Sequence, residues 1–63
     1  MIQIDKSLIN TPVYVFKTDD YDKFGILISI DESYITLRYF SGREIMILRE
    51  DIRNIRPYKT QVR

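Results

Sequence analysis

Apolar and polar positions alternate along most of this chain, which is the pattern of β-strands that bury one face. The clearest example is Gly25–Ile30, which a turn at Asp31-Glu32-Ser33 separates from a second alternating stretch that begins at Tyr34. Over the whole sequence, the alternation predicts strands near residues 13–18, 23–31, 34–40, 44–49 and 52–56. Turn-forming residues separate them, at Asp19-Asp20, Asp31-Glu32-Ser33, Ser41-Gly42 and Glu50-Asp51. The chain is therefore expected to be all-β.

Two glycines shape the expected sheet. Gly42 falls in the loop between the third and fourth predicted strands and is expected at positive φ. Gly25 falls inside the second predicted strand, where glycine usually marks a bulge or a sharp bend. Five short strands with a bent second strand predict a small, strongly bent, five-stranded barrel.

The N-terminal segment allows two interpretations. Asp5 is placed to cap one or two helical turns through Lys6–Ile9, with Ile4 on the same face as Leu8. Alternatively, Ile2 and Ile4 alternate as an extra edge strand. The short helical turn is the preferred interpretation.

Length and composition limit the classes of protein that this chain represents. A chain of 63 residues makes one domain, near the lower limit for a single hydrophobic core. Pro57 ends the last predicted strand, so we predict a barrel domain over residues 1–57 and a flexible basic tail over residues 58–63. The absence of cysteine fits a reducing, cytoplasmic compartment, and no apolar run is long enough to span a membrane.

The net charge is only +1, but the charges are unevenly distributed. Residues 1–32 have an excess of three negative charges, and residues 33–63 have an excess of four positive charges. Such asymmetry suggests that the basic half contacts nucleic acid, although a solvated surface with a basic tail explains it equally well.

No catalytic or metal-binding constellation is recognisable. The chain has no histidine, and Ser7 and Ser41 have no identifiable base partner, so we expect no enzymatic activity. Asp19, Asp20 and Asp22 lack the spaced oxygen ligands, the glycine and the closing glutamate of a calcium loop. We therefore expect no metal and no cofactor, and a function exercised through a surface.

Aromatic residues occupy many strand positions, namely Tyr14, Phe16, Phe24, Tyr34, Tyr39 and Phe40. Most are expected in the core or between subunits, because aromatic rings suit half-buried strand positions. Tyr34 follows a turn directly, so it either stacks on a nucleic-acid base or covers the core at the end of a strand.

The last two predicted strands have apolar side chains on more than one face, at Met46, Leu48, Ile52 and Ile55. In a monomer, an apolar and unpaired edge strand is an aggregation hazard. Pairing these edges between subunits removes the hazard, and a closed ring of identical subunits leaves no free edge.

Three groups of residues are informative because of the order in which they follow one another along the chain. They are Ser7-Leu8 with Pro12-Val13 and Val15; then Gly25, Ser29 and Asp31 with Ile35, Leu37 and Arg38; then Arg49-Glu50-Asp51-Ile52 with Ile55 and Pro57. Together they resemble the Sm-like family, which includes the bacterial Hfq proteins. The resemblance implies a strongly bent five-stranded barrel of the SH3-like or Sm-like type. It also implies a homohexameric or homoheptameric ring, joined through the fourth and fifth strands, that binds single-stranded RNA around its pore.

The same resemblance implies the residues of the RNA site. Asp31 would orient the loop, Tyr34 stands where a base-stacking residue often lies, and Arg49 stands where a basic residue closes the pocket. Ile35 completes the site at a position that usually holds asparagine, and Glu50 replaces a glycine or histidine. These departures weaken the expectation of uridine specificity. The alternative function is a structural or protein-interaction module that binds no nucleic acid.

Overall fold

The computed structural model describes residues 3–18 and 21–58, which form an antiparallel sheet of five strands. The strands are β1 (Pro12–Lys17), β2 (Lys23–Ile30), β3 (Tyr34–Arg38), β4 (Glu44–Leu48) and β5 (Ile52–Pro57). Two short 3₁₀ helices accompany them: η1 (Lys6–Leu8) precedes β1, and η2 (Arg49–Asp51) joins β4 to β5. The all-β class and the five predicted strands are confirmed, with ends that differ by no more than two residues.

Asp5 caps η1. Its Oδ1 accepts a hydrogen bond of 2.9 Å from the backbone N–H of Ser7. Hydrogen bonding from Ser7, first from its backbone and then from its side chain, lowers the pKa of the Asp5 carboxyl below its ordinary value. Ile4 and Leu8 pack against the core, and Ile4 belongs to no strand. The preferred helical interpretation of this segment is therefore confirmed, while Ile2 lies outside the described residues.

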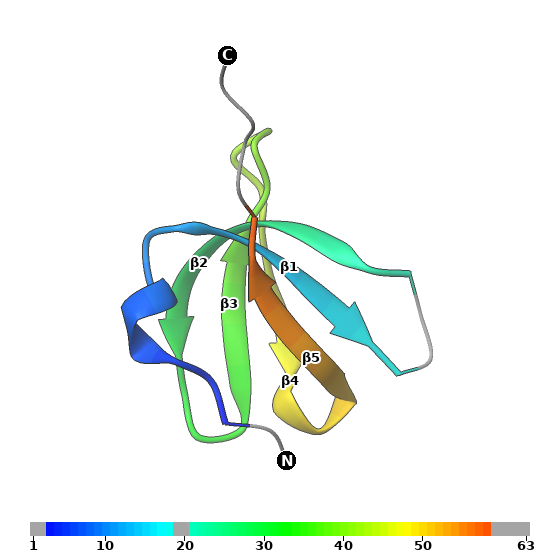
Figure 1. Ribbon diagram of the computed structural model, residues 1–63. Helices are drawn as coiled ribbons and strands as arrows, with labels where there is room; N and C mark the ends of the chain where they lie inside the picture. Colours follow the sequence, from blue (N-terminus) through cyan, green and yellow to red (C-terminus); the bar gives the residue numbers. More distant parts are fainter. Residues whose placement is uncertain (1–2, 19–20, 59–63) are drawn as a thin grey trace.

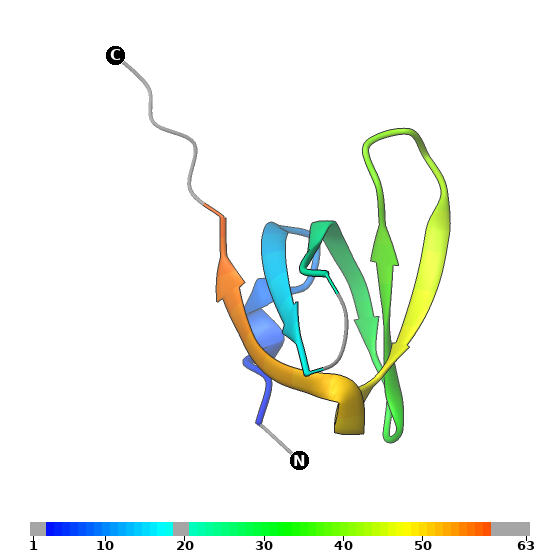
Figure 2. The ribbon, with the colours of Figure 1, turned by 90° about the vertical axis from the view of Figure 1, so that its right-hand side faces the viewer.

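The order of the strands in the sheet is β4-β3-β2-β1-β5, and every neighbouring pair is antiparallel. β4 and β5 are consecutive in the chain, yet they form the two edges of the sheet. In Figure 2, β4 and β5 meet at η2 and extend from it on opposite sides of the molecule. Within the described residues no ladder joins these two strands, so the sheet is open.

β2 changes direction within the sheet. In Figure 1 it crosses the top of the view and then turns down beside β3. Its register with β3 shifts between Leu27 and Ser29, and such an irregularity bends a strand and increases its twist. Gly25 is regularly paired with Val13, so the register shift lies beyond Gly25 and, of the two alternatives predicted for this glycine, the bulge is not found there, while the bend stays a prediction.

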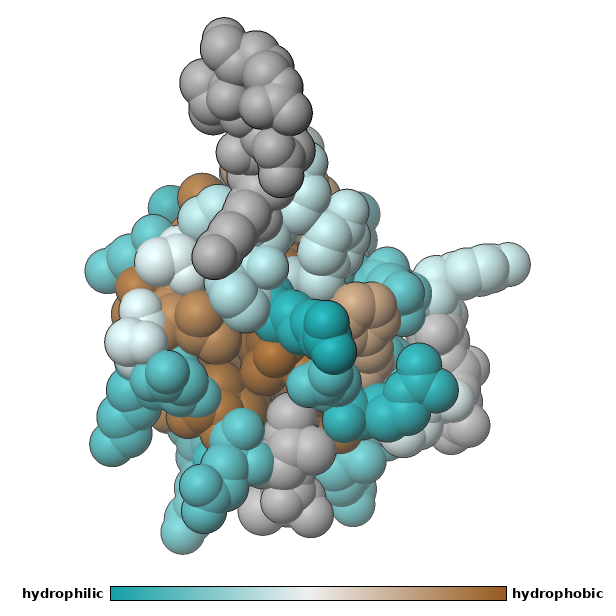
Figure 3. Space-filling model, in the orientation of Figure 1, coloured by the Kyte–Doolittle hydropathy of each residue, from teal (hydrophilic) through white to brown (hydrophobic). Residues whose placement is uncertain are grey.

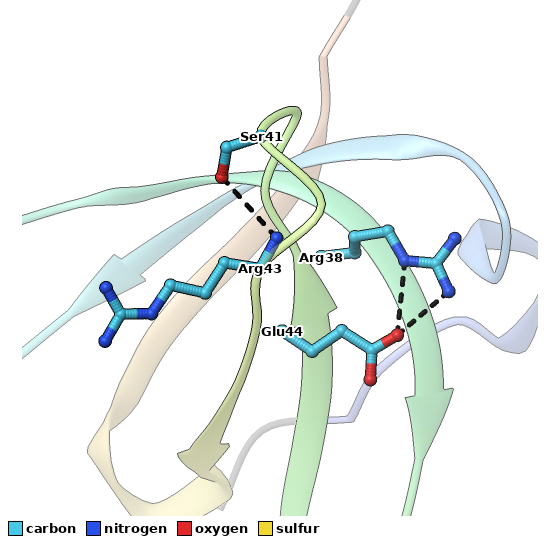
Figure 4. A network of polar contacts seen from close by, with 4 residues as sticks. All are labelled: Arg38, Ser41, Arg43 and Glu44. Atoms are coloured by element: carbon cyan, nitrogen blue, oxygen red, sulfur yellow. Dashed lines mark hydrogen bonds and ion pairs between the residues drawn. The ribbon is translucent and has the colours of Figure 1, made fainter.

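The hairpin that joins β3 to β4 is held by backbone and side-chain hydrogen bonds. Gly42 has φ 98°, as predicted, and donates its N–H to the carbonyl oxygen of Tyr39 at 2.9 Å. Arg38 donates from Nε and Nη2 to one carboxylate oxygen of Glu44, at 3.2 and 2.9 Å. Figure 4 shows this pair on one side of the hairpin, while the side chain of Arg43 extends away from it.

All five strands contribute to the hydrophobic core. Its buried residues are Val13, Val15, Leu27, Ile35, Leu37, Ile47 and Ile52. Around them pack partly buried side chains from η1, from the strands and from the residues that follow them, including Leu8, Ile30 and Tyr39. Figure 3 shows apolar surface in the middle of the face seen in Figure 1, with hydrophilic residues around it. This incomplete cover is expected for so short a chain.

Tyr58, the first residue of the predicted tail, lies against the sheet. Its N–H donates to the carbonyl oxygen of Pro12 at 2.9 Å, and its ring packs against those of Tyr14 and Phe24. The rest of the predicted tail, residues 59–63, lies outside the described residues. In the described part of the chain, no helix is long and apolar enough to cross a membrane.

Candidate nucleic-acid interface

The loop between β2 and β3 forms one wall of the candidate site. Ile30 pairs with Ile35 in the ladder, and the N–H of Asp31 donates to the carbonyl oxygen of Tyr34 at 2.8 Å. This bond closes a tight turn, which leaves Asp31 exposed and Tyr34 half-buried at the start of β3. The turn therefore places Tyr34 at the edge of the loop.

Arg49 joins this loop from the far end of β4. Tyr34 pairs with Leu48, and the N–H of Arg49 donates to the carbonyl oxygen of Ser33 at 2.8 Å. The Arg49 guanidinium also donates from Nη1 to the carbonyl oxygen of Asp31 at 3.0 Å. The structure thus brings together Asp31, Tyr34 and Arg49, three of the predicted site residues, which we call the loop site.

Ile35, the fourth predicted site residue, is not part of the loop site. It has no exposed surface, belongs to the hydrophobic core and pairs with Ile47 on β4. Side chains alternate along β3, so Tyr34 and Ile35 point to opposite faces of the sheet. The side chain of Ile35 therefore fills the core and offers no contact surface to a ligand.

Two glutamates lie beside the loop site. A hollow of about 190 Å³ beside it is lined by Glu32, Ser33, Leu48 and Glu50. The Arg49 guanidinium is directed to the Asp31 carbonyl, while both glutamates are exposed. Phosphate groups are repelled by such carboxylates, so the loop site suits the stacking or edge recognition of a base better than the binding of a backbone phosphate.

A second group of candidate residues was not expected from the sequence. Five aromatic side chains form a connected group on the outer face of the sheet, which we call the aromatic cluster: Tyr14, Phe16, Phe24, Phe40 and Tyr58. The ring centroid of Tyr14 lies 6.1 Å from that of Phe16 and 5.0 Å from that of Phe24. The ring of Phe24 lies 5.1 Å from Phe40 and 4.4 Å from Tyr58.

Most aromatic residues were predicted either in the core or between subunits, and the structure does not place them in the core, while their position between subunits stays a prediction. None of the buried core residues is aromatic, and Tyr39 alone among the tyrosines packs against the core from a partly buried position. Tyr14 and Phe16 alternate with the buried Val13 and Val15, so both faces of β1 are apolar. The apolar residues on both faces of β1 are visible in the sequence, but they do not show which face is buried.

Of the three aspartates considered for calcium, the structure describes only Asp22. Asp19 and Asp20 lie outside the described residues, and Asp22 is exposed. Among the residues that the structure describes, no three acidic side chains come close enough to hold a metal ion.

The chain was compared with protein-family models, with curated proteins and with solved structures. No family model matches it, and no curated protein or solved structure matches it either.

Proposed function

We propose that this chain is an Sm-like, SH3-like barrel protein that forms a homo-oligomeric ring and binds single-stranded RNA. The observation that carries the RNA part is the loop site, where Asp31, Tyr34 and Arg49 meet through backbone and guanidinium hydrogen bonds. These are the residues that the resemblance to the Sm-like family assigns to the RNA pocket. Tyr34 is half-buried at the loop edge, and a base would stack on the exposed part of its ring.

The open sheet supports assembly through its edges. β4 and β5 are the unpaired edge strands, and β4 exposes two apolar side chains, Met46 at 65% and Leu48 at 48%. Unpaired apolar edges associate unless they are protected, and the pairing of β4 with β5 of the next subunit satisfies both edges. The two edges differ, so this contact is heterologous and closes only as a ring, which by the resemblance holds roughly six or seven copies.

The loop site supports weak discrimination among bases. Uracil selection requires donors and acceptors that reach the base edge, and the Ile35 side chain is buried in the core. The groups left for edge recognition are the carboxylate of Asp31 and backbone groups of the loop. In this proposal RNA binds mainly by stacking on Tyr34, and U-rich and A-rich strands bind with similar affinity.

Light scattering after gel filtration, combined with native mass measurement, tests the assembly. The expected mass is roughly six or seven times that of the 7.6 kDa chain, with and without a short oligo-U. A matched pair of variants locates the contact: Leu48→Lys, on the β4 edge, should reduce the mass, and Ser41→Lys, on the β3–β4 loop, should not. A native chain that is monomeric at micromolar concentration contradicts the ring.

A structural or protein-interaction module without nucleic acid is the alternative function. Glu32 and Glu50 beside Arg49 favour it, because an acidic loop repels an anionic ligand. Salt titration separates the two functions. Affinity for an RNA homopolymer falls with salt to the extent that basic groups of the protein displace counterions from the phosphates, whereas an RNA-independent module shows no such binding.

A further inference from the structure

Two rings of the aromatic cluster are accessible to a ligand. Phe40 is 64% exposed and Tyr14 is 37% exposed, while Phe16, Phe24 and Tyr58 are half-buried around them. The half-buried rings pack against the exposed ones and limit their rotation. Exposed aromatic rings that pack together with half-buried ones on the surface of so small a domain are typical of an interaction surface.

Positive charge borders the cluster at the β5 side. Arg56 pairs with Tyr14 across the β1–β5 ladder, and Tyr14 pairs with Phe24 in turn, so the three side chains share one face. A hollow of about 220 Å³ next to this row is lined by Phe16, Arg53, Asn54 and Arg56. The cluster therefore continues directly into a basic depression.

These two arginines are available to a ligand. Arg53 and Arg56 are exposed, and in the described part of the chain neither forms an ion pair or a side-chain hydrogen bond. Arg38, by contrast, is engaged with Glu44 through two hydrogen bonds to the same carboxylate oxygen. Within the described residues, the two arginines beside the rings thus have no acidic partner.

We propose that the aromatic cluster, together with Arg53 and Arg56, is a binding surface for a single-stranded nucleic acid. Bases stack on the accessible rings of Tyr14 and Phe40, and the phosphates that link them lie against the arginines. A strand of planar bases on an anionic backbone matches both parts of the surface. An apolar protein segment would match the rings but leave the two positive charges without partners.

This surface is separate from the loop site and does not depend on it. The loop site offers one tyrosine among carboxylates, whereas the aromatic cluster combines several rings with unneutralised arginines. The proposed binding surface depends only on the residues of the aromatic cluster and the two arginines, and it does not require that the chain forms a ring. If both sites bind RNA, the outer face supplies the phosphate contacts that the acidic loop lacks.

Fluorescence anisotropy with labelled oligo-U and oligo-dT tests this surface in the full chain. Phe40→Ala and Tyr14→Ala should each weaken binding about 5- to 150-fold, the loss expected for one stacked base. Arg56→Ala should weaken binding to both oligonucleotides and reduce the salt slope by about 1 or slightly less. Tyr21→Ala removes an aromatic ring outside the cluster that is 85% exposed, and Lys6→Ala removes a positive charge from η1; neither should change the affinity.

Thermal unfolding and native mass are measured for every variant, so that loss of binding is not confused with loss of folding. Because Phe40 is largely exposed, Phe40→Ala should remain folded. If Tyr14→Ala unfolds, the affinity of Phe40→Ala alone tests whether bases stack on the aromatic cluster. If Phe40→Ala and Arg56→Ala both bind the oligonucleotides as tightly as the native chain does, the proposed binding surface is wrong. If Tyr34→Ala loses binding in that case, the loop site alone binds RNA. Absence of any binding by the native chain overturns both sites, and a change of native mass in Phe40→Ala would then identify a protein contact.

Discussion

The carbonyl oxygen of Arg38 lies where a side chain at Gly25 would begin. A Cβ added at Gly25 would stand 2.5 Å from that oxygen and 3.3 Å from Cγ of Leu37. The oxygen belongs to the backbone of β3 and cannot move without disturbing the β2–β3 ladder. Gly25→Ala is therefore expected to destabilise the domain by about 1–3 kcal/mol, as overpacking does elsewhere, measured by urea unfolding.

Gly42 provides the contrast for this prediction. No atom lies within 4 Å of a Cβ added there, but its φ of +98° disfavours side chains. Asparagine tolerates positive φ better than alanine does. The free energy of unfolding should therefore be higher for Gly42→Asn than for Gly42→Ala. At Gly25 asparagine should be at least as harmful as alanine, because the obstacle is space. A Gly25→Ala variant as stable as the native chain would show that β3 relaxes.

Ile35→Ala tests whether this residue belongs to the core or to the RNA site. Ile35 is fully buried, so the substitution should cost about 2–5 kcal/mol, and Ile35→Val about 0.5–1.5 kcal/mol. Ile35→Val should bind RNA as the native chain does, because the side chain never reaches the ligand. Loss of RNA affinity in a stably folded Ile35→Val variant would show that Ile35 contributes to the RNA site.

The period-two pattern predicted more of the fold than of the surfaces. Strand positions, the turn at Gly42 and the Asp5 cap follow from local preferences, and each is present. The pattern did not distinguish the faces of β1, since Val13 and Val15 are as apolar as Tyr14 and Phe16. Hydrophobicity alone does not separate a core face from an aromatic outer face, and the difference is decided by packing against η1 and the other strands.

The candidate site shows the same division. Asp31, Tyr34 and Arg49 came from the resemblance, and the hydrogen bonds from Arg49 to residues of the β2–β3 loop bring them together. The inward direction of Ile35 follows from strand alternation, but only once Tyr34 is known to face outward. The shift between Leu27 and Ser29 changes which side chains of β2 face the core, and the sequence contains no proline or glycine that marks it.

The Asp5 cap predicts a specific dependence of stability on pH. The pKa of Asp5 is lowered in the folded state, so its contribution is fully present above the ordinary aspartate pKa of about 3.9 and is lost as the pH falls through the lower folded value. Asp5→Asn retains an acceptor oxygen but does not titrate. The stability advantage of the native chain over Asp5→Asn should therefore shrink below about pH 3.9 in urea unfolding. An advantage that is constant with pH would show that the carboxylate charge has no part in the cap.

Arg49 is expected to affect both stability and RNA binding. Arg49→Ala removes the hydrogen bond to the Asp31 carbonyl and should cost about 1 kcal/mol of stability, because this bond is exposed. If the guanidinium also contacts RNA, the variant should bind more weakly with a shallower salt slope, and its oligomeric mass should stay unchanged. Arg49→Lys is the matched variant, since it retains the charge and should preserve the salt slope. Reduced stability with unchanged RNA affinity in Arg49→Ala would leave this residue a purely structural role.

Tyr34 and Tyr39 lie on the same stretch of chain but are expected to differ in function. Tyr34 is half-buried at the loop edge, so Tyr34→Ala should lose about 1–3 kcal/mol of RNA affinity, equally for oligo-U and oligo-A, because every base has a face on which to stack. Tyr39 packs against the core, so Tyr39→Ala should lower the free energy of unfolding and leave RNA affinity intact in the folded fraction.

Isothermal titration with both oligonucleotides, alongside urea unfolding of both variants, separates these effects. Tyr34→Phe is the third variant: it retains the ring and loses only the hydroxyl, so stacking predicts an affinity close to that of the native chain. A strong preference of the native chain for oligo-U would show that backbone groups of the Asp31–Tyr34 turn recognise the edge of uracil. An affinity that Tyr34→Ala leaves unchanged would mean that this tyrosine only covers the end of β3, and RNA binding would then have to come from the outer face.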